Sequence, residues 1–316
     1  MNARHPSMLR YPYGIVRKQP GRQSASPAPH GFAARAYTPA SEPPPPAHGG
    51  EHSEISGIEH STTLPGRVSL VGAGPGDAEL LTVRAARRIA EADALVYDHL
   101  VSDDILELVR PEAQRIYVGK EAGNHALPQE QINRLLVQLA RQGLRVVRLK
   151  GGDPFIFGRG GEEMQELVEA GIHCEVVPGV TAAAGMAACT GIPLTHREHA
   201  QTLVLTTGHL KDGTVNLDWP ALARPHQTVV IYMGLGALEI ICAELTAHGL
   251  PADTPAAVVH AATTPRQQIV TAPLHALPAS VRAAGLRTPS LIVIGPVVDL
   301  HHVLCTAVPA AMAFSA

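Results

Sequence analysis

The chain has 316 residues, long enough for two domains of ordinary size, and 45% of them are hydrophobic, which is ample for a core. Only 3% are aromatic, so that core must be mainly aliphatic. The formal net charge of −3 excludes an overall attraction to nucleic acid or to an anionic membrane, and any anion binding must come from local basic clusters.

Neither the apolar runs nor the cysteines indicate a membrane or secreted protein. No apolar run approaches the roughly 18 residues that span a bilayer. The four cysteines are far apart and form no Cys-x-x-Cys pair, which indicates scattered buried thiols in a reducing compartment rather than a disulfide framework or a zinc site. Both features predict a cytoplasmic protein. The cysteines are Cys174, Cys189, Cys242 and Cys305.

Residues 1–65 lack the periodic apolar pattern of a folded chain and contain a proline run at 43–46. We predict a disordered N-terminal extension here. Several arginines precede the first acidic residue, Glu42, and such an Arg-rich, acid-poor start is also typical of an organelle transit peptide. A start codon placed too early, with Met8 as a later one, is a further interpretation.

Residues 66–195 alternate short apolar runs with stretches of helical period. Alternating β and α units with short turns predict an N-terminal α/β domain with a five-stranded parallel sheet covered by helices on both faces. Ser102 is the expected N-cap of the second helix. Strands are expected at 67–71, 94–97, 116–118, 146–149 and 174–177. Helices are expected at 78–92, 102–109, 128–141 and 162–169.

An Ala-rich helix ending near Thr190 precedes a second α/β series, which we assign to a C-terminal domain at 196–316 with a short tail. Strands follow one another more directly near residue 265, so the second sheet is predicted to be mixed. Strands are expected at 202–206, 229–232, 256–260, 268–271 and 290–294. Helices are expected at 236–248 and 277–284.

The first glycine loop, residues 72–77, follows a strand and precedes a helix, and Asp98 lies about 20 residues further on, as in a dinucleotide-binding fold. Its glycines follow the pattern G-x-G-x-G rather than G-x-G-x-x-G. Pro75 removes a main-chain N–H, and Asp77 would repel a phosphate at the head of the next helix. The loop therefore favours a ligand without a polyphosphate, and a nicotinamide-dependent enzyme is the alternative.

The second glycine loop, residues 150–163, reads Lys-Gly-Gly-Asp-Pro-Phe-Ile-Phe-Gly-Arg-Gly-Gly-Glu-Glu. Its glycines allow close approach of the main chain to a ligand, and it opens from the carboxyl end of a strand, where open α/β sheets bind their ligands. Asp153 precedes Pro154, so its backbone is expected to be extended and its carboxylate to project out of the turn. A tight turn with its phenylalanines in the core is the alternative.

Four stretches together resemble the tetrapyrrole methylase family, and within it the members that methylate uroporphyrinogen III. The similarity extends over residues 66–300 in the family's order and spacing. It implies two α/β domains with an active-site cleft between them and assembly as a homodimer. The four stretches are 71–77 with 80–82, 97–102, 151–163, and 178–182 with 191–197.

The resemblance implies transfer of two methyl groups from S-adenosyl-L-methionine to carbons 2 and 7 of uroporphyrinogen III, with S-adenosyl-L-homocysteine as by-product. The product is precorrin-2, at the branch to sirohaem and cobalamin. This cofactor carries no phosphate and therefore suits the first glycine loop better than NAD does. In the family, cofactor contacts fall at positions that are here Pro75, Gly151, Gly152, Asp153, Ile156, Thr181, Ala182, Met233 and Ala262.

The chemistry requires positioning and a base that removes a proton from the macrocycle as the new bond forms. Asp98, at the carboxyl end of the second expected strand, is the candidate base, and the resemblance points to the same residue. Lys120 matches the family's proposed proton donor. A capping or salt-bridge carboxylate is the alternative for Asp98, and binding of a substrate carboxylate is the alternative for Lys120.

The substrate that the resemblance implies carries several carboxylates, so positive charge must gather around it. Arg159 and Arg197 are the first candidates for such ion pairs, with His196 and Lys150 as weaker ones. The loop that carries His209 and Lys211 resembles the family's loop over the cleft. Although the chain has 17 histidines, it has no His-Glu-x-x-His motif, and we predict no metal site.

Some family members carry an N-terminal dehydrogenase-ferrochelatase domain, for which residues 1–65 are too short, so we expect a stand-alone methylase. A relative that binds tetrapyrrole or cofactor without turnover is the alternative from a different functional class. The presence of Asp98, Asp153 and Arg159 favours the enzyme.

Overall fold

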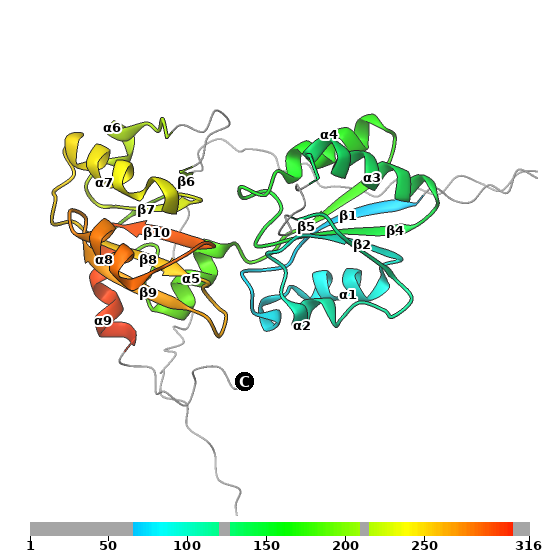
Figure 1. Cartoon of the computed structure of the whole chain (residues 1–316), viewed down its shortest axis with the longest axis horizontal. Coiled ribbons are helices and arrows are strands. Elements are labelled where there is room, and N and C mark those ends of the chain that lie inside the picture. The colour runs from blue at the N-terminus through cyan, green and yellow to red at the C-terminus, as the bar shows by residue number, and fades with distance from the viewer. Residues whose placement is uncertain (1–65, 120–126, 209–214, 306–316) are drawn as a thin grey trace, which may run out of the picture. The chain divides into compact units, whose positions relative to one another are not determined.

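The computed structural model describes residues 66–119, 127–208 and 215–305. These residues form two five-stranded sheets with helices packed on them (Figure 1). The N-terminal extension predicted at 1–65 lies outside the described residues, and so do Lys120, His209 and Lys211.

The first sheet is parallel throughout, with the strand order β3-β2-β4-β1-β5, which confirms the predicted arrangement. Gly72 at the end of β1 is opposite Lys150 at the end of β4, and Val71 is opposite Val177 at the end of β5. The carboxyl ends of three adjacent strands therefore meet at one edge. The strands are β1 (Arg67–Gly72), β2 (Ala94–Tyr97), β3 (Gln114–Tyr117), β4 (Arg145–Lys150) and β5 (His173–Val177).

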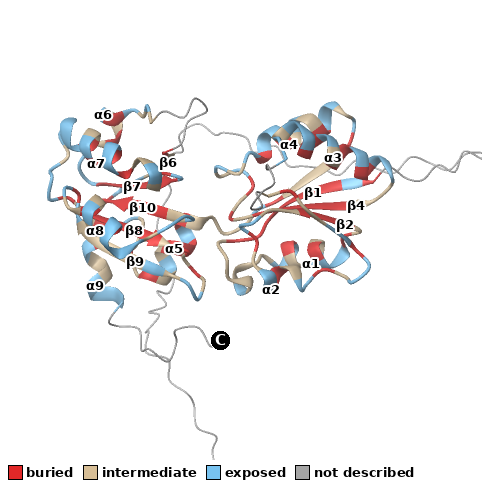
Figure 2. Ribbon diagram, in the orientation of Figure 1, coloured by how far each residue is buried: buried red, intermediate tan, exposed pale blue. Residues whose placement is uncertain are grey.

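Helices cover both faces of this sheet because alternate strand residues point to opposite sides. Val68 and Leu70 pack under α3 and α4, whereas Val71 and Leu149 pack against α1 and α2. The middle strands are accordingly buried, and each helix is buried on its inner side (Figure 2). The helices are α1 (Val83–Glu91), α2 (Asp103–Leu106), α3 (Gln129–Arg141) and α4 (Gly160–Glu169).

Two helices of this half begin and end differently from the prediction. The helix expected at 78–92 is interrupted, because a 3-10 turn η1 (Ala78–Leu80) ends before α1 and the Thr82 hydroxyl then caps α1 by accepting the N–H of Ala85 at 3.1 Å. The helix expected at 102–109 is the single turn α2. Ser102 occupies its N-cap position, but the buried Ser102 hydroxyl makes no hydrogen bond.

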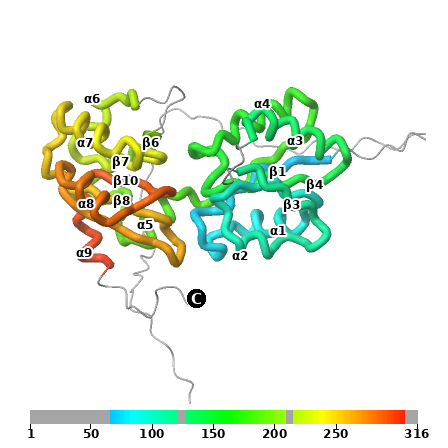
Figure 3. Tube along the Cα trace, in the orientation of Figure 1, coloured from blue at the N-terminus to red at the C-terminus, as the bar shows by residue number. Residues whose placement is uncertain are grey.

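The second sheet has the order β6-β7-β10-β8-β9, with β6 parallel to β7 and the other pairs antiparallel, which confirms a mixed sheet. Its apolar residues pack with α6, α7 and α8 on one face and with α5 on the other. Figure 3 traces the chain through these elements. The strands are β6 (Thr202–Thr207), β7 (Gln227–Tyr232), β8 (Pro255–His260), β9 (Gln268–Pro273) and β10 (Ser290–Ile294). The helices are α5 (Ala182–Thr190), α6 (Trp219–Leu222), α7 (Leu238–Ala247) and α8 (Leu277–Ala284).

Helix α5 lies within the predicted N-terminal domain by chain order, but it packs on the second sheet. Ala183 and Met186 are buried with residues of β7, β8 and β10, although the predicted N-terminal domain runs to residue 195. That domain division stays a prediction. Helix α6 and the C-terminal elements η3 (Pro296–Asp299) and α9 (Leu300–Leu304) were not expected, because elements of four or five residues are too short to show a helical period.

The four cysteines are free, and of the expected buried thiols only Cys242 is buried, since Cys174 and Cys189 are half-buried and Cys305 is exposed. Burial raises the pKa of the Cys174 and Cys242 thiols to about 11, so both are protonated at neutral pH. Within the described ranges, no helix is long and apolar enough to cross a membrane.

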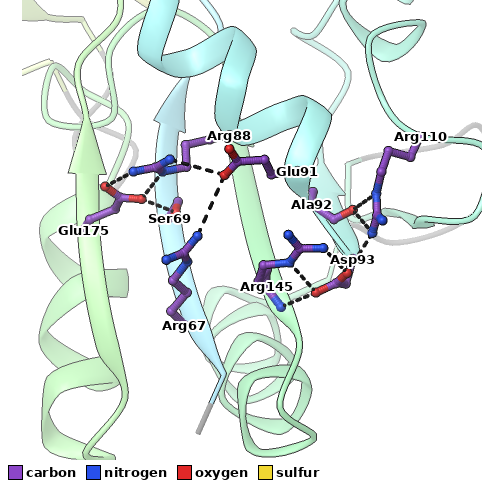
Figure 4. Close-up of polar contacts among 9 residues, drawn as sticks. All are labelled: Arg67, Ser69, Arg88, Glu91, Ala92, Asp93, Arg110, Arg145 and Glu175. Atoms are coloured by element: carbon purple, nitrogen blue, oxygen red, sulfur yellow. Dashed lines mark hydrogen bonds and ion pairs between the residues drawn. The ribbon is translucent and has the colours of Figure 1, made fainter. Parts of the chain in front are cut away.

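Ion pairs hold the amino-terminal part of the first sheet together (Figure 4). Asp93, just before β2, accepts hydrogen bonds from the main-chain N–H, Nε and Nη2 of Arg145 at 2.8, 2.9 and 2.8 Å. Arg110 adds a fourth at 2.7 Å. The Arg145 bonds hold the pKa of Asp93 well below its usual range. Nearby, Arg88 of α1 binds Glu175 of β5 and lowers the pKa of that carboxyl too.

We expect Asp93→Asn to lower the free energy of unfolding at pH 7 by about 1–2 kcal/mol, because the two arginines lose their shared anion. A carboxyl whose pKa is depressed by folding stabilises the protein above its unfolded pKa, near 3.9, and loses that contribution as the pH falls. The difference in the free energy of unfolding between the native protein and the variant should therefore shrink as the pH falls from 5 to 3. Urea unfolding at each pH measures it, with Glu91→Gln at an exposed pair as the control; a difference that stays constant would contradict the assignment.

Candidate active site

Three loops cross at the carboxyl ends of β1, β4 and β5, and their main chains come so close to one another that only glycine fits at the crossing. A Cβ on Gly72 would lie 2.6 Å from the carbonyl oxygen of Gly152, and one on Gly179 would lie 2.2 Å from that same oxygen. Gly152 also donates its N–H to the carbonyl of Gly74 at 2.6 Å, and Gly74 returns a bond at 3.2 Å. The two glycine loops that the sequence singled out are therefore one hydrogen-bonded platform.

The Asp153 carboxylate is built into this platform, and the expectation that it projects out of the turn is wrong. Its Oδ1 accepts the N–H of Phe155 at 2.9 Å, and its Oδ2 accepts the N–H of Gly179 at 3.0 Å. A short carboxylate readily bonds the N–H two residues further on, and this turns it back towards its own loop. Asp153 thus holds the second glycine loop against the segment that follows β5.

Tyr232, the last residue of β7, joins the second sheet to this platform. Its hydroxyl lies 2.7 Å from Oγ1 of Thr181 and accepts the N–H of Ala183 at 3.0 Å, at the start of α5. The ring of Phe157 from the second glycine loop lies 4.8 Å from the Tyr232 ring, centroid to centroid. Met233 follows with a left-handed φ of 54° and a half-exposed side chain.

The first glycine loop meets α5 and the turn after β8. The ring of Pro75 lies against Gly185, where a Cβ would come within 2.4 Å of it. Asp77 donates its main-chain N–H to Oγ1 of Thr263 at 3.3 Å. A Cβ on Gly76 would lie 2.7 Å from Thr264. The turn that contains the predicted Ala262 position is therefore in direct contact with the first glycine loop.

The predicted cofactor positions consequently lie on connected segments. Ile156, Ala182 and Ala262 pack against one apolar cluster, although they come from three different segments. A Cβ on Gly152 would be in ordinary contact with Ala182, 3.5 Å from its N. Gly151 packs against Leu100, where a Cβ would lie 2.7 Å from the Leu100 side chain. Sequence positions almost two hundred residues apart thus share one region of the structure.

Asp98 lies beside this region, at the end of β2. Its Oδ1 accepts the N–H of Leu100 at 3.1 Å, and its Oδ2 accepts from Nη2 of Arg148 at 3.2 Å. The salt bridge that was the alternative for Asp98 is therefore present. The side chain stays 22% exposed, so the ion pair does not bury it completely. Lys120, its expected partner in proton transfer, lies outside the described residues.

The cationic candidates have different surroundings. Arg159 has a left-handed φ of 57° at the N-cap of α4, and its exposed guanidinium binds Glu162 at 2.9 and 2.7 Å. Arg197 lies in an exposed turn that begins at His196. Lys150 is wrong as a substrate-binding candidate, because its side chain is only 5% exposed and its Nζ binds the carboxylate of Glu163 at 2.8 Å. Burial lowers the pKa of Lys150.

A cluster that the sequence motifs missed lies in the same turn as Arg197. One ligand atom each from His196, Glu198 and His199 lie within 4.8 Å of one another, a spacing that a metal ion could bridge. The His-x-Glu-His pattern differs from the helical His-Glu-x-x-His motif. Nδ1 of His196 already accepts the main-chain N–H of Glu198 at 3.2 Å, however, so one nitrogen of the cluster is in use. We assign no metal to it.

Arg148 and Glu163 were also missed, although a signal for Arg148 was present in the sequence. Residues of a central parallel strand are buried on both faces, so Arg148 and Lys150, two residues apart on β4, had to lie on one buried side and needed an anion there. Glu163, an acidic residue in the first turn of α4, is fully buried.

The fold and these loops define an α/β protein whose ligand loops leave the carboxyl ends of parallel strands and contact a second, mixed sheet. The chain belongs to the tetrapyrrole (corrin/porphyrin) methylase family, which matches residues 67–278. The resemblance stated from the sequence motifs is thereby confirmed.

Relatives of known name are similar over the described region. A siroheme synthase of Nitrosospira multiformis is 57% identical over 249 residues, 78% of this chain and 53% of the relative. The chain spans about half the length of the curated relatives it matches. A uroporphyrin-III C-methyltransferase of Thermus thermophilus, solved with S-adenosylhomocysteine, is 41% identical with a TM-score of 0.65, over 74% of this chain and 94% of that one. A cobalt precorrin-4 methyltransferase is 30% identical with a TM-score of 0.66, over 74% and 96%.

Proposed function

We propose that this chain transfers methyl groups from S-adenosyl-L-methionine to uroporphyrinogen III at carbons 2 and 7, giving precorrin-2. The observation that carries the proposal is the platform of crossing glycine loops at Gly72, Gly152 and Gly179. It lies in a chain that is 41% identical to a uroporphyrin-III C-methyltransferase solved with S-adenosylhomocysteine.

The platform fits this cofactor better than it fits a dinucleotide. Gly151 and Gly152 have no Cβ, so a neutral adenosine can approach the main chain closely at these residues. Pro75 offers no N–H to a pyrophosphate, and the Asp77 carboxylate caps η1, where a phosphate would have to bind. A cationic sulfonium is not repelled by such a site. These features support S-adenosyl-L-methionine over the nicotinamide alternative.

When bound, this cofactor supplies a methyl group to an electron-rich carbon of the macrocycle. We assign Asp98 as the base that accepts the proton that the macrocycle loses as the carbon–carbon bond forms. Lys120 is the proposed proton donor. Arg159 and Arg197 are the proposed partners of substrate carboxylates, and Arg159 can bind one by exchanging its exposed contact with Glu162.

The family resemblance also supports a homodimer and a cytoplasmic location, which we include in the proposal. A relative that binds the tetrapyrrole without turnover is the competing function. The partly exposed Asp98 side chain favours the enzyme, because a base must be accessible to its substrate.

Anaerobic incubation of the purified chain with S-adenosyl-L-methionine and uroporphyrinogen III tests the proposal directly, with the product mass as the readout. We expect a gain of two methyl groups and release of S-adenosyl-L-homocysteine. If no methyl group is gained although S-adenosyl-L-homocysteine still binds, the proposed substrate is wrong and a later precorrin should be tried. If neither binds, the proposed cofactor is wrong as well.

A further inference from the structure

A chain of charged contacts extends beneath the second glycine loop from α4 to the end of β2. Glu163 of α4 is fully buried, and the side chains of Lys150 and Arg148 on β4 are each 5% exposed. Oε1 of Glu163 accepts from Nζ of Lys150 at 2.8 Å, from Nε of Arg148 at 3.2 Å and from Nε2 of Gln129 at 3.0 Å. One buried carboxylate oxygen therefore holds two cations and an amide.

Arg148 connects this buried carboxylate to Asp98. Its Nε binds Glu163, its Nη1 donates to the carbonyl of Leu149 at 2.9 Å, and its Nη2 donates to Oδ2 of Asp98 at 3.2 Å. A planar guanidinium can bind two carboxylates in fixed directions at once, which a lysine ammonium on a flexible stem cannot do. The position of Nη2 is therefore fixed by the contacts of the same guanidinium with Glu163 and with the main chain of β4.

Both oxygens of Asp98 are consequently held by donors of the protein, the main-chain N–H of Leu100 on one and the buried Arg148 on the other. Stability alone does not account for such an arrangement, since well-packed apolar side chains in place of a buried ion pair are often neutral or stabilising. A fixed direction of the carboxylate is what the network adds.

We propose that Arg148 is a positioning residue for Asp98, and that Glu163, bound to Lys150, holds Arg148 in place. This inference rests on the proposed function, in which Asp98 is the base. Arg148 does not contact the substrate in this scheme. It acts by keeping the carboxylate aimed at the reacting carbon, where a misplacement of about 1 Å can lower the rate by as much as 10²-fold.

Arg148→Gln is expected to lower kcat by roughly 10- to 100-fold, with the affinity for S-adenosyl-L-homocysteine and the KM for the methyl donor unchanged within about twofold. The matched control is Arg145→Gln. Arg145 lies on the same strand and also binds an aspartate, but at the amino-terminal edge of the sheet. We expect it to lose stability and to keep kcat. Equal kcat values for the two variants would overturn the positioning role.

A double-mutant cycle with Asp98→Asn separates positioning from general damage to the fold. If Arg148 acts through Asp98, Arg148→Gln will lower the single-turnover rate in the native background but not in the Asp98→Asn background. A further loss of the same size in both backgrounds would contradict the proposal. Arg148→Lys should recover only part of the rate, because a single ammonium nitrogen on a flexible stem does not fix the directions of both carboxylates.

Two further results keep the test conclusive. If Arg148→Gln does not fold, Glu163→Gln replaces it: this isosteric change removes the charge behind Arg148, and its smaller rate loss must also vanish with Asp98→Asn. If Asp98→Asn itself leaves kcat unchanged, the assignment of the base fails, and the role of Arg148 fails with it. A product without added methyl groups in the native protein would instead reject the proposed function.

Discussion

Asp98→Ala is expected to lower kcat for methyl transfer by on the order of 10²–10⁴, the range over which general acid–base groups contribute. Cofactor binding should persist, because Asp98 lies after β2 and the glycine platform is held by bonds that do not involve it. Initial rates at saturating donor, together with calorimetric titration of S-adenosyl-L-homocysteine, measure both quantities on the same preparation.

The matched control is Asp104→Ala, at an exposed carboxylate in the first turn of α2, a few residues further along. It should leave kcat as it is. Turnover of Asp98→Ala at the native rate would reject the base and leave the Arg148 ion pair as the role of this carboxylate. Loss of cofactor binding together with turnover would indicate that Asp98 supports the loops rather than the chemistry.

Gly179→Ala is expected to weaken binding of the methyl donor. The new Cβ would lie 2.2 Å from the carbonyl oxygen of Gly152 and 2.8 Å from Cα of Gly72, and both neighbours are main chain that cannot rotate away. The loops must separate, which costs about 1–3 kcal/mol of stability by analogy with overpacked cores. We expect a lower melting temperature and at least about a tenfold loss of S-adenosyl-L-homocysteine affinity, which corresponds to 1.4 kcal/mol.

Gly161→Ala is the control, because a Cβ there meets no atom within 4 Å and Gly161 lies in α4. Alanine is the better helix former by roughly 1 kcal/mol, so this variant should bind as the native protein does and melt slightly higher. The two substitutions are chemically identical, and their expected effects on stability have opposite signs because the added Cβ meets main chain at Gly179 and no atom at Gly161. Native affinity in Gly179→Ala would show that the crossing of the loops does not form the binding platform.

Strand positions could be predicted from the sequence because a strand that is buried on both faces is a short, nearly continuous apolar run. The runs at 94–97 and 290–294 coincide with β2 and β10, and the other strands differ from the prediction by a few residues at their ends. A local side-chain contact also interrupts the helix that the apolar pattern predicted at 78–92. Thr82 divides a stretch of helical period into η1 and α1, because a threonine hydroxyl caps the start of a helix more favourably than a threonine residue continues one.

The glycine loops and the family could be predicted from the sequence, because residue types and spacing carry them, and the role of Asp98 stays a prediction. The partners of the site could not be predicted. Tyr232 and Thr263 reach the platform from the second sheet, and no pattern along the chain relates them to Thr181 or Asp77.

The sequence by itself determined the alternating architecture, the place of the ligand loops and the choice of a cofactor without phosphate, because each depends on residues next to one another in the chain. Only the tertiary structure decided which buried charges meet. Glu163, Arg148 and Asp98 come from α4, β4 and the end of β2, and their pairing depends on the order in which the strands lie side by side. A buried charge requires a partner, but it leaves no mark in the sequence that says which residue that partner is.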